Sequence, residues 1–349
     1  MNYQTPFKNN ISNLFRLFIN MIYIEYKVRL NIYIIIYIYI IYIIMDFVSI
    51  LYDNKIEYDL LKLQLYSFRF VDESIINNIY LLFNDEADKN KKFEEEYLSS
   101  IEGFVPIHLK SKIEIIYITD LISLDKPYIS DWFSQQFAKI YVSRIVKSSI
   151  YIVLDVKCIF IRPINKNTFF IDGKIKLYNE GLDCDKMVEF YKNCFNYFGI
   201  DNYESYRHSD REVTCSPPFT FITQECKKLV QYVEDKENMN LYDFFNLRKY
   251  TEAYFYFAWL CFTNNKRYDF VNEYHKTVII GPLDPKIYEF NSWKYKIEFI
   301  NNNEANIICI HRKCIDILDN NYKNNIIEFI NNLFKNSEID TLLRNLLFH

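Results

Sequence analysis

The sequence predicts an α/β protein whose central sheet is mostly parallel, and two observations support this. An apolar, strand-like run at 47–52 is followed by a helical pattern at 58–70 and by a second apolar run at 75–83. Further runs at 113–122 and 151–154 extend the order to β-α-β-α-β-α-β. Such units bury their parallel strands and bring the carboxyl ends to one edge of the sheet, where open α/β proteins bind ligands.

Length and composition limit the classes of protein to consider. The 349 residues are 50% hydrophobic and 25% charged, which allows one large or two small domains with an ample core. The net charge of -4 gives no basic footprint, so we expect no nucleic-acid partner. The eight cysteines include no Cys-x-x-Cys pair, and in a chain of this size we interpret them as reduced and mostly buried.

The N-terminal segment 1–45 is of low complexity and rich in Ile and Tyr. Its apolar run at 30–44 follows Lys27 and Arg29, a pattern typical of a signal anchor with the basic flank inside. The run is shorter than the roughly 20 apolar residues that a membrane span needs. The alternative is translated low-complexity sequence in front of a domain that starts near Met45. A cytoplasmic and a membrane-associated location both stay open.

Polar residues follow the first two predicted strands. Asp53 and Asn54 come after the run at 47–52, where they either form the turn or contact a ligand. Asn84 and Asp85 end the second strand, and we expect the charged stretch that follows to be a solvated loop and helix face.

The central block runs from Ser130 to Pro163. Its first part, SDWFSQQFAKIYVSRIV, predicts an amphipathic helix that Asp131 or Ser130 caps. Its second part is a β-branched strand that stops at Asp155 and resumes as CIFI. A carboxylate directly after a fully apolar strand lies at the carboxyl edge of the sheet. Asp155 is therefore the first candidate for chemistry.

This block resembles the nucleotide-sugar glycosyltransferases of the A-type fold, and most of all a branch of bacterial and large-virus proteins. The residues that carry the resemblance are Trp132, Gln135, Gln136, Lys139, Leu154, Asp155, Phe160, Arg162 and Pro163. The resemblance implies a Rossmann-like, mostly parallel sheet flanked by helices, with an antiparallel extension on the acceptor side. It implies transfer of a hexose from a nucleotide-diphosphate sugar to a glycan or protein acceptor.

The family's strand ends in Asp-x-Asp, which holds a divalent ion against the donor's diphosphate, but here the tripeptide is Asp155-Val156-Lys157. Three hypotheses follow. In the first, Lys157, with Arg162, binds phosphate directly in place of the ion. In the second, Asp155 and His311 still hold Mn²⁺ or Mg²⁺. In the third, the protein binds a nucleotide sugar or a glycan without turnover.

The resemblance also assigns roles to individual side chains. Tyr52 and Asp53 are expected at the base and ribose of the donor. The complete donor-binding set is Tyr52, Asp53, Gln136, Lys139, Lys157 and Arg162. Asp155 and Glu252 are the predicted catalytic residues, with Glu252 as a hydrogen-bond partner or base. A Glu at a helix N-terminus is also favoured by the macrodipole whatever the function, so that explanation stays open.

Periodicity predicts further elements along the remaining chain. The expected elements are a hairpin turning at Asp172-Gly173, a helix at 185–198, a helix capped by Thr223, an apolar helix at 249–260, a late strand within 305–314 that carries His311, and helices at 326–334 and 339–348. The two last helices either lie on a membrane or pack on the sheet.

The predicted organisation is therefore a segment 1–45, a glycosyltransferase-like domain at 46–317 and C-terminal helices at 318–349. Hexosyl transfer is the function that we predict. The alternatives are a catalytically inactive nucleotide-sugar or glycan-binding relative and a membrane-anchored interaction protein. The sequence has no Gly-x-Ser-x-Gly motif and no Gly-rich phosphate loop. Phosphate would therefore have to be bound by side chains.

Overall fold

A computed structural model gives the fold, and the chain divides into two units, 1–43 and 44–349. The residues that the structure describes are 23, 25–27, 29, 44–52, 54–85, 98–123, 128–129, 131–180, 185–206, 212–213, 217–274, 277–280, 293–302, 305–315 and 318–348.

In the first unit the described residues are helical and include an exposed ion pair of 2.7 Å between Arg29 and Glu25. The predicted membrane anchor at 30–44 lies outside the described residues except for Ile44. Among the helices of the described residues, none is both long and apolar enough to cross a membrane.

The central sheet of the second unit has five strands in the order β3-β2-β1-β4-β9. The strands are β1 (Met45–Leu51), β2 (Ile76–Phe83), β3 (Ile113–Tyr117), β4 (Ile150–Asp155) and β9 (Phe219–Ile222). Four of them are parallel, and β9 pairs antiparallel with β4. The predicted mixed α/β fold with a mostly parallel sheet is thus confirmed.

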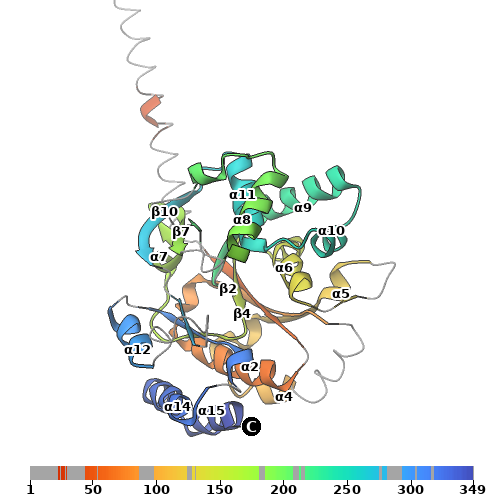
Figure 1. The fold of residues 1–349 in the computed structure, drawn as a ribbon. Coiled ribbons are helices and arrows are strands. Elements are labelled where there is room, and N and C mark those ends of the chain that lie inside the picture. Colours follow the sequence, from red (N-terminus) through yellow and green to blue (C-terminus); the bar gives the residue numbers. More distant parts are fainter. Residues whose placement is uncertain are drawn as a thin grey trace, which may run out of the picture. The chain divides into compact units, whose positions relative to one another are not determined.

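Helices cover both faces of this sheet. Figure 1 shows α6 (Trp132–Tyr141), α8 (Asp185–Tyr197), α9 (Thr223–Glu237), α10 (Leu241–Arg248) and α11 (Glu252–Phe262) on one side, and α2 (Lys55–Ser67), α14 (Asn320–Phe334) and α15 (Ser337–Phe348) on the other. The remaining helices are α4 (Leu98–Ile101), α5 (Ile118–Leu121), α7 (Lys166–Phe169), α12 (Trp293–Asn302) and α13 (Arg312–Ile315).

The core follows from the two-residue period of the strands, because successive side chains of β1 point to opposite faces. Val48 and Ile50 join the buried cluster formed with α6, α8, α9 and α11. Phe47 points to the other face, where its ring meets that of Phe68 at 5.4 Å. Since both faces are covered, β1 is buried along its whole length, as its unbroken apolar sequence predicts.

Asp46 lies at the amino edge of the sheet and is fully buried. One carboxylate oxygen accepts hydrogen bonds from the side chain of Asn77 (2.8 Å) and the backbone N–H of Asn78 (3.1 Å). The other accepts from the backbone N–H groups of Lys147 and Ser148, both at 2.7 Å. Four donors therefore satisfy this charge, and it joins β1 to the segments that enter β2 and β4.

The third predicted strand is shorter than expected. We predicted 113–122, but β3 ends at Tyr117 and the chain continues as the short helix α5. The reason is pairing: β2 ends at Phe83, which lies opposite Tyr117, so residues beyond Tyr117 have no strand to pair with.

A smaller sheet extends the fold beyond β4. It has the order β10-β7-β6, with β8 paired to β7. Its strands are β6 (Phe170–Ile171), β7 (Lys174–Glu180), β8 (Glu212–Val213) and β10 (Tyr268–Tyr274). The predicted hairpin joins β6 and β7, and both of its turn residues, Asp172 and Gly173, have positive φ, as a two-residue turn of type I′ requires. The parallel pairing of β10 with β7 was not predicted.

A third sheet has the order β11-β12-β5 and brings the late part of the chain to the carboxyl edge of β4. Its strands are β5 (Cys158–Phe160), β11 (Thr277–Ile280) and β12 (Ile307–Ile310). Cys158 lies opposite Cys309, with 3.1 Å between the two buried sulfur atoms, and both thiols are free.

The two C-terminal helices pack on α2. The rings of Tyr66 and Phe334 meet at 5.2 Å, and the amide of Asn336 donates to the hydroxyl of Tyr66 (2.9 Å). The apolar stripes of α14 and α15 are thereby buried within the second unit. Thr223 differs from its predicted role as an N-cap. It is the first residue of α9, and its hydroxyl donates to the carbonyl of Ser148 (2.6 Å).

Candidate functional site

A cleft of about 730 Å³ lies at the carboxyl edge of the central sheet. From β1 the chain first builds β2 and β3 on one side and then returns to place β4 on the other. The strand order therefore reverses between β1 and β4, which is the point where open α/β sheets form a crevice. Ile50 lies directly beside Asp155 at this point, and both residues line the cleft.

Four charged side chains form a linked chain behind and along the cleft wall. The ammonium group of Lys157 lies 2.8 Å from Oδ2 of Asp155, and that of Lys139 lies 3.2 Å from Oδ1. Lys139 also lies 2.7 Å from Oε1 of Glu252. Asp155 and Lys157 line the cleft, whereas Lys139 and Glu252 are buried behind it. Two positive and two negative groups balance, as buried charges must.

The environment of each group shifts its pKa. Burial alone would raise the pKa of Asp155, but the ammonium groups of Lys139 and Lys157 outweigh it and hold that pKa well below its usual range. Burial opposes the charge of Lys157, yet the neighbouring Asp155 carboxylate raises its pKa. Burial raises the pKa of Glu252, and Lys139 offsets part of that rise. Asp155 and Lys157 therefore form a pair that stays charged near neutral pH.

Local sequence fixes the positions of these groups. Asp131 and Ser134 form a capping box that starts α6, and the helix then carries Lys139 to Asp155. The buried amide of Gln64 on α2 donates to the backbone carbonyls of Asp155 (2.8 Å) and Cys158 (3.1 Å). The turn that carries Lys157 is thus held at both of its ends.

A second charged group faces the cleft from a distant part of the chain. Arg312, the first residue of α13, lies 3.0 Å from Oε1 of Glu57 and stacks over the ring of Tyr52, 4.9 Å from its centroid. All three residues line the cleft. Burial raises the pKa of Glu57 to about 7, although the charge of Arg312 pulls it down. Burial also raises the pKa of Tyr52.

Most of the predicted site residues lie in or directly behind this cleft. Tyr52, Asp155, Lys157 and His311, which are far apart in sequence, line it. Lys139 and Glu252 contact this group from behind. Gln136 is buried and donates to the carbonyl of Trp132 (2.9 Å), while its neighbour Gln135 lines the cleft.

Two predicted residues have another position. Arg162 is half-buried and is not among the described residues that line the cleft. Asp53 lies outside the described residues. Its neighbour Asn54 lines the cleft and also caps α2, because its side chain accepts from the N–H of Glu57 (3.0 Å).

Sequence reasoning missed Glu57 and Arg312. Glu57 reads as an ordinary acid in the first turn of a helix, which the macrodipole favours without any function. Arg312 is the residue after His311, and the only available signal was its place at the end of the late strand. The pair joins residues 255 positions apart, so no local pattern could have revealed it.

The residues present do not fit a divalent ion bound by Asp155 and His311. Both oxygens of Asp155 already lie within 3.2 Å of lysine ammonium groups. Mg²⁺ and Mn²⁺ prefer several oxygen ligands, and a fixed positive charge beside the carboxylate opposes them. Within the described ranges, no group of three or more His, Cys, Asp or Glu side chains could hold a metal ion. The second hypothesis thus lacks a suitable donor set here.

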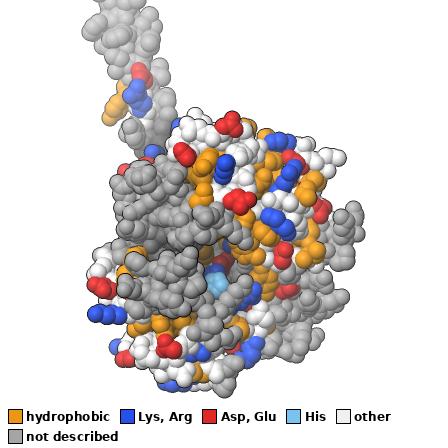
Figure 2. All heavy atoms as spheres, viewed as in Figure 1, with side chains coloured by type: hydrophobic (Ala, Val, Ile, Leu, Met, Phe, Trp, Pro, Cys, Tyr) orange, Lys and Arg blue, Asp and Glu red, His pale blue; other side chains and the backbone are white. Residues whose placement is uncertain are grey.

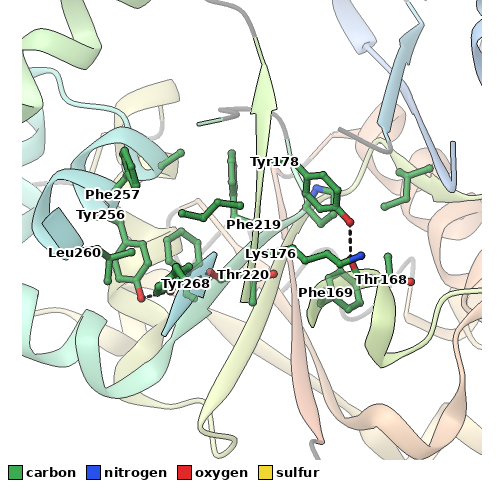
Figure 3. A pocket seen from close by; sticks show the side chains of 15 residues that line it. Thr168, Phe169, Lys176, Tyr178, Phe219, Thr220, Tyr256, Phe257, Leu260 and Tyr268 are labelled. Carbon is green, nitrogen blue, oxygen red and sulfur yellow. Dashed lines mark hydrogen bonds between the residues drawn. The ribbon is translucent and has the colours of Figure 1, made fainter. Parts of the chain in front are cut away.

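A second cavity, of about 50 Å³, lies between β7, β9 and α11. Figure 3 shows the hydroxyls of Tyr256 and Tyr268 pointing toward each other, at 2.6 Å, and that of Tyr178 toward the carbonyl of Thr168, at 2.7 Å. The lining is mostly apolar, and Lys176 is its one charged member among the described residues. The volume suits only a few water molecules, so the cavity is a packing defect beside the core and the charged cleft remains the candidate site.

Basic side chains are spread over the face drawn in Figure 2. Among the atoms shown in colour, Lys and Arg alternate with Asp and Glu and with hydrophobic side chains, and they do not gather into one broad area. This face therefore shows no broad basic area, and the Lys and Arg side chains that line the cleft are Lys157 and Arg312 among the described residues.

Fold and site together define an open α/β protein with a charged ligand cleft at its topological switch point. The chain belongs to a family described as of unknown function, DUF6492, whose model matches residues 53–314. That range covers β2 to β12 and includes Asp155, Lys157 and Arg312. No curated protein matches the sequence.

Several solved structures are similar at low identity. The apo structure of the bifunctional glycosyltransferase WbbM shares 9% identity at a TM-score of 0.45, over 88% of this chain and 52% of that one. This chain thus spans about half the length of WbbM. The galactosyltransferase LgtC, solved with donor and acceptor sugar analogs, shares 14% identity at a TM-score of 0.41, over 83% and 96%. Mouse xyloside xylosyltransferase 1 shares 13% identity at a TM-score of 0.40, over 76% of this chain and 97% of that one. Similarity at this level does not define the function of this chain.

Proposed function

We propose that the protein is a glycosyltransferase that takes a hexose from a nucleotide-diphosphate sugar and binds the diphosphate through Lys157 and Arg312. The observation that carries the proposal is the cleft at the switch point of the sheet, which holds two cationic side chains beside the carboxylate of Asp155. The resemblance around Trp132 to Pro163 supports the same class of reaction. The names of the similar solved structures agree with it without adding weight.

Lys157 and Arg312 have the properties that binding a diphosphate requires. Their side chains are 25% and 36% exposed, so both reach the cleft while their stems are held by the protein. Each is paired with one carboxylate, Asp155 or Glu57, which fixes its position before a ligand arrives. Charge-assisted hydrogen bonds from lysine and arginine to phosphate oxygens are among the strongest in proteins.

In the proposed reaction, the bond between the anomeric carbon and the β-phosphate oxygen breaks, and a bond from that carbon to an acceptor hydroxyl oxygen forms. The diphosphate leaves with the electron pair, and the charges of Lys157 and Arg312 stabilise it as it departs. The acceptor's hydroxyl proton passes to the departing phosphate oxygen. Asp155 is a weak base here, because Lys139 and Lys157 hold its pKa low.

Glu252 has a different part in this proposal. It was predicted to face the sugar or the acceptor hydroxyl, and that role stays a prediction. Its carboxylate is buried against Lys139, which in turn contacts Asp155. This arrangement favours a positioning role in which Glu252 keeps Lys139, and through it Asp155, in place.

The experiment that tests the proposal is calorimetric titration of the full chain with UDP, GDP and ADP, with EDTA and then with Mn²⁺. We expect one of them to bind with an affinity that changes less than about threefold on adding Mn²⁺. Lys157→Gln should weaken binding by about 10- to 100-fold, since it removes a charge-assisted contact worth roughly 1.5–3 kcal/mol. Release of that nucleotide from its hexose conjugate, measured with an acceptor mixture, then tests transfer.

Lys174→Gln is the matched control, because Lys174 forms an exposed ion pair of 3.2 Å with Asp269 and is not among the described residues that line the cleft. It should leave nucleotide binding unchanged. Nucleotide binding that requires Mn²⁺ would show that the site uses the ion and would contradict diphosphate binding by Lys157 and Arg312 alone. Absence of binding to all three nucleotides, with folded protein, would remove the glycosyltransferase proposal itself.

A second candidate function is binding of a nucleotide sugar without transfer. The observation that favours it is the complete pairing of Asp155 by two lysines, which leaves this carboxylate engaged in the absence of ligand. The same experiment separates the two functions. Binding that depends on Lys157, with no nucleotide released from any hexose conjugate, identifies a binding protein.

A further inference from the structure

One wall of the charged cleft carries an exposed tryptophan that neither the fold nor the proposed diphosphate contacts account for. Trp132 is the first residue of α6, lines the cleft and is 45% exposed. A tryptophan that packs only to complete a core is usually much more buried. A large flat ring kept at the edge of a ligand cleft is typical of a binding surface.

Several hydrogen bonds hold the backbone that carries this ring. Asp131 and Ser134 form the capping box around Trp132, and the hydroxyl of Tyr52 donates to the carbonyl of Asp131 (2.8 Å). The amide of Gln136 donates to the carbonyl of Trp132 itself (2.9 Å). The backbone under the ring is thus fixed on a helix start, so a ligand would meet a pre-organised surface.

Helix α8 completes the surface beside Trp132. The ring of Phe190 lies 6.0 Å from that of Trp132, and Met187, one helical turn earlier, also lines the cleft. We call Trp132, Met187 and Phe190 the aromatic platform. Gln135 lines the cleft one turn along α6 and provides a side-chain amide next to the platform. An apolar flat surface with an amide at its border suits a ligand with one apolar face and polar edges.

Two of the three platform residues come from α8, which is not part of the β-α-β units that form a nucleotide crevice. Trp132 precedes β4, but Met187 and Phe190 come from α8, which follows the hairpin of β6 and β7 rather than a β-α-β unit. At the other border, Asp85 follows Asn84, whose amide donates to Ser134 (3.1 Å). A carboxylate at this border disfavours a phosphate and favours the hydroxyl groups of a neutral ligand.

We propose that the aromatic platform binds a pyranose ring of a carbohydrate acceptor, with the C–H face of the sugar stacked on Trp132 and its hydroxyls bonded by Gln135 and neighbouring polar groups. That the saccharide is an acceptor rests on the proposed function. The inference adds that this acceptor is a glycan. The binding event itself can be measured without any transfer reaction.

The test is a saturation-transfer NMR titration of the full chain with the methyl pyranosides of glucose, galactose, mannose and xylose and with lactose. Trp132→Leu keeps an apolar side chain but removes the flat ring, and Trp132→Phe restores a ring. We expect at least one saccharide to bind, Trp132→Leu to weaken its binding about tenfold or more, and Trp132→Phe to recover most of it. UDP, GDP and ADP binding should change less than about twofold in both variants.

Phe262→Leu is the matched control, because Phe262 is also 45% exposed but is not among the described residues that line the cleft. It should bind saccharide like the native chain. The inference is overturned by equal saccharide binding in Trp132→Leu, by a parallel loss of nucleotide binding, which would assign the ring to the donor's base, or by no saccharide binding. A native chain that binds saccharide through Trp132 but binds no nucleotide refutes the proposed function and leaves the platform standing.

Discussion

The two edges of the central sheet treat a buried carboxylate in opposite ways. At the amino edge, Asp46 at the start of β1 accepts four hydrogen bonds, three of them from backbone N–H groups. At the carboxyl edge, Asp155 at the end of β4 is held by the side chains of Lys139 and Lys157. Both residues flank apolar strands that pair with each other. Sequence context alone makes the two look alike.

The two carboxylates differ in whether a partner can be replaced by a ligand. The backbone donors around Asp46 belong to β2 and to the turn that enters β4, so they can move only if the backbone does. Lys157 is a flexible side chain that a phosphate can draw away from Asp155, after which Lys139 still balances the carboxylate. Under the proposed function, the carboxylate fixed by backbone groups serves the fold, and the one fixed by lysines serves the site. Substitutions at the two edges should therefore have different consequences.

The largest effect should follow from Lys139→Met. This change leaves Asp155 and Glu252 buried without the ammonium group between them. Because removal of one partner from a buried ion pair strands the other charge, the free energy of unfolding should fall by about 3–5 kcal/mol, measured by urea denaturation at pH 7. Adding Glu252→Gln should restore part of the loss. A loss no greater than that of the surface variant Lys174→Met would show that the buried network does not hold this edge together.

A pH dependence should come from Glu57, whose pKa burial raises to about 7. The folded protein therefore keeps this proton between the unfolded pKa, about 4.5, and about 7, so folding takes up a proton there. The contribution to stability is complete below pH 4.5 and is lost as the pH rises through 7. Relative to Glu57→Gln, the native chain should lose about 3 kcal/mol across this window.

Asp155 should change stability with pH in the opposite direction to Glu57, and over a more acidic pH range. Its folded pKa is held below the unfolded value, so its contribution is present above about pH 4 and is lost as the pH falls below that. The urea midpoints of the native chain and of Glu57→Gln, measured from pH 4.5 to 8, isolate the effect of Glu57. Parallel curves for the native chain and Glu57→Gln would show that the carboxyl of Glu57 is already ionised at acid pH.

The smallest of the three effects should come from Asp46→Asn at the amino edge. The amide keeps the shape and one acceptor oxygen, but its NH₂ group faces two N–H donors. We expect a loss of about 2 kcal/mol in the free energy of unfolding, with no change in nucleotide affinity. Calorimetry of UDP, GDP and ADP binding checks the second half. A change in nucleotide affinity comparable to that of Lys157→Gln would contradict the division of roles between the two edges.

Local patterns predicted most elements of the central sheet and its helices. The apolar runs of β1, β2 and β4 and the cap at Asp131 needed only neighbours within a few residues. The runs of β5 and β12 were predicted, but their pairing was not, because the partners are remote: Cys158 and Cys309 are 151 positions apart. The end of β3 depended on the end of β2, which its own sequence does not encode.

The candidate site was predictable where a motif marked it and not elsewhere. Asp155 and Lys157 followed from one strand and its turn. Glu252 was found by resemblance, but its partner Lys139 lies 113 positions away, and only the folded chain reveals that the two are joined. Arg312 carried no motif at all. Charges that meet across the fold are set by topology, and a linear pattern contains no record of which acid each base will contact.

The pairing of β12 with β5 has a consequence for how this cleft comes into being. Arg312 reaches the cleft because the strand before it, β12, pairs with β5 beside Cys158. During synthesis, the ribosome will have released every strand of the central sheet before this arginine emerges. A protein stopped ahead of residue 305 would thus carry the lysine half of the cleft without the arginine half. A fragment that keeps both cationic side chains of the cleft must therefore extend through α13.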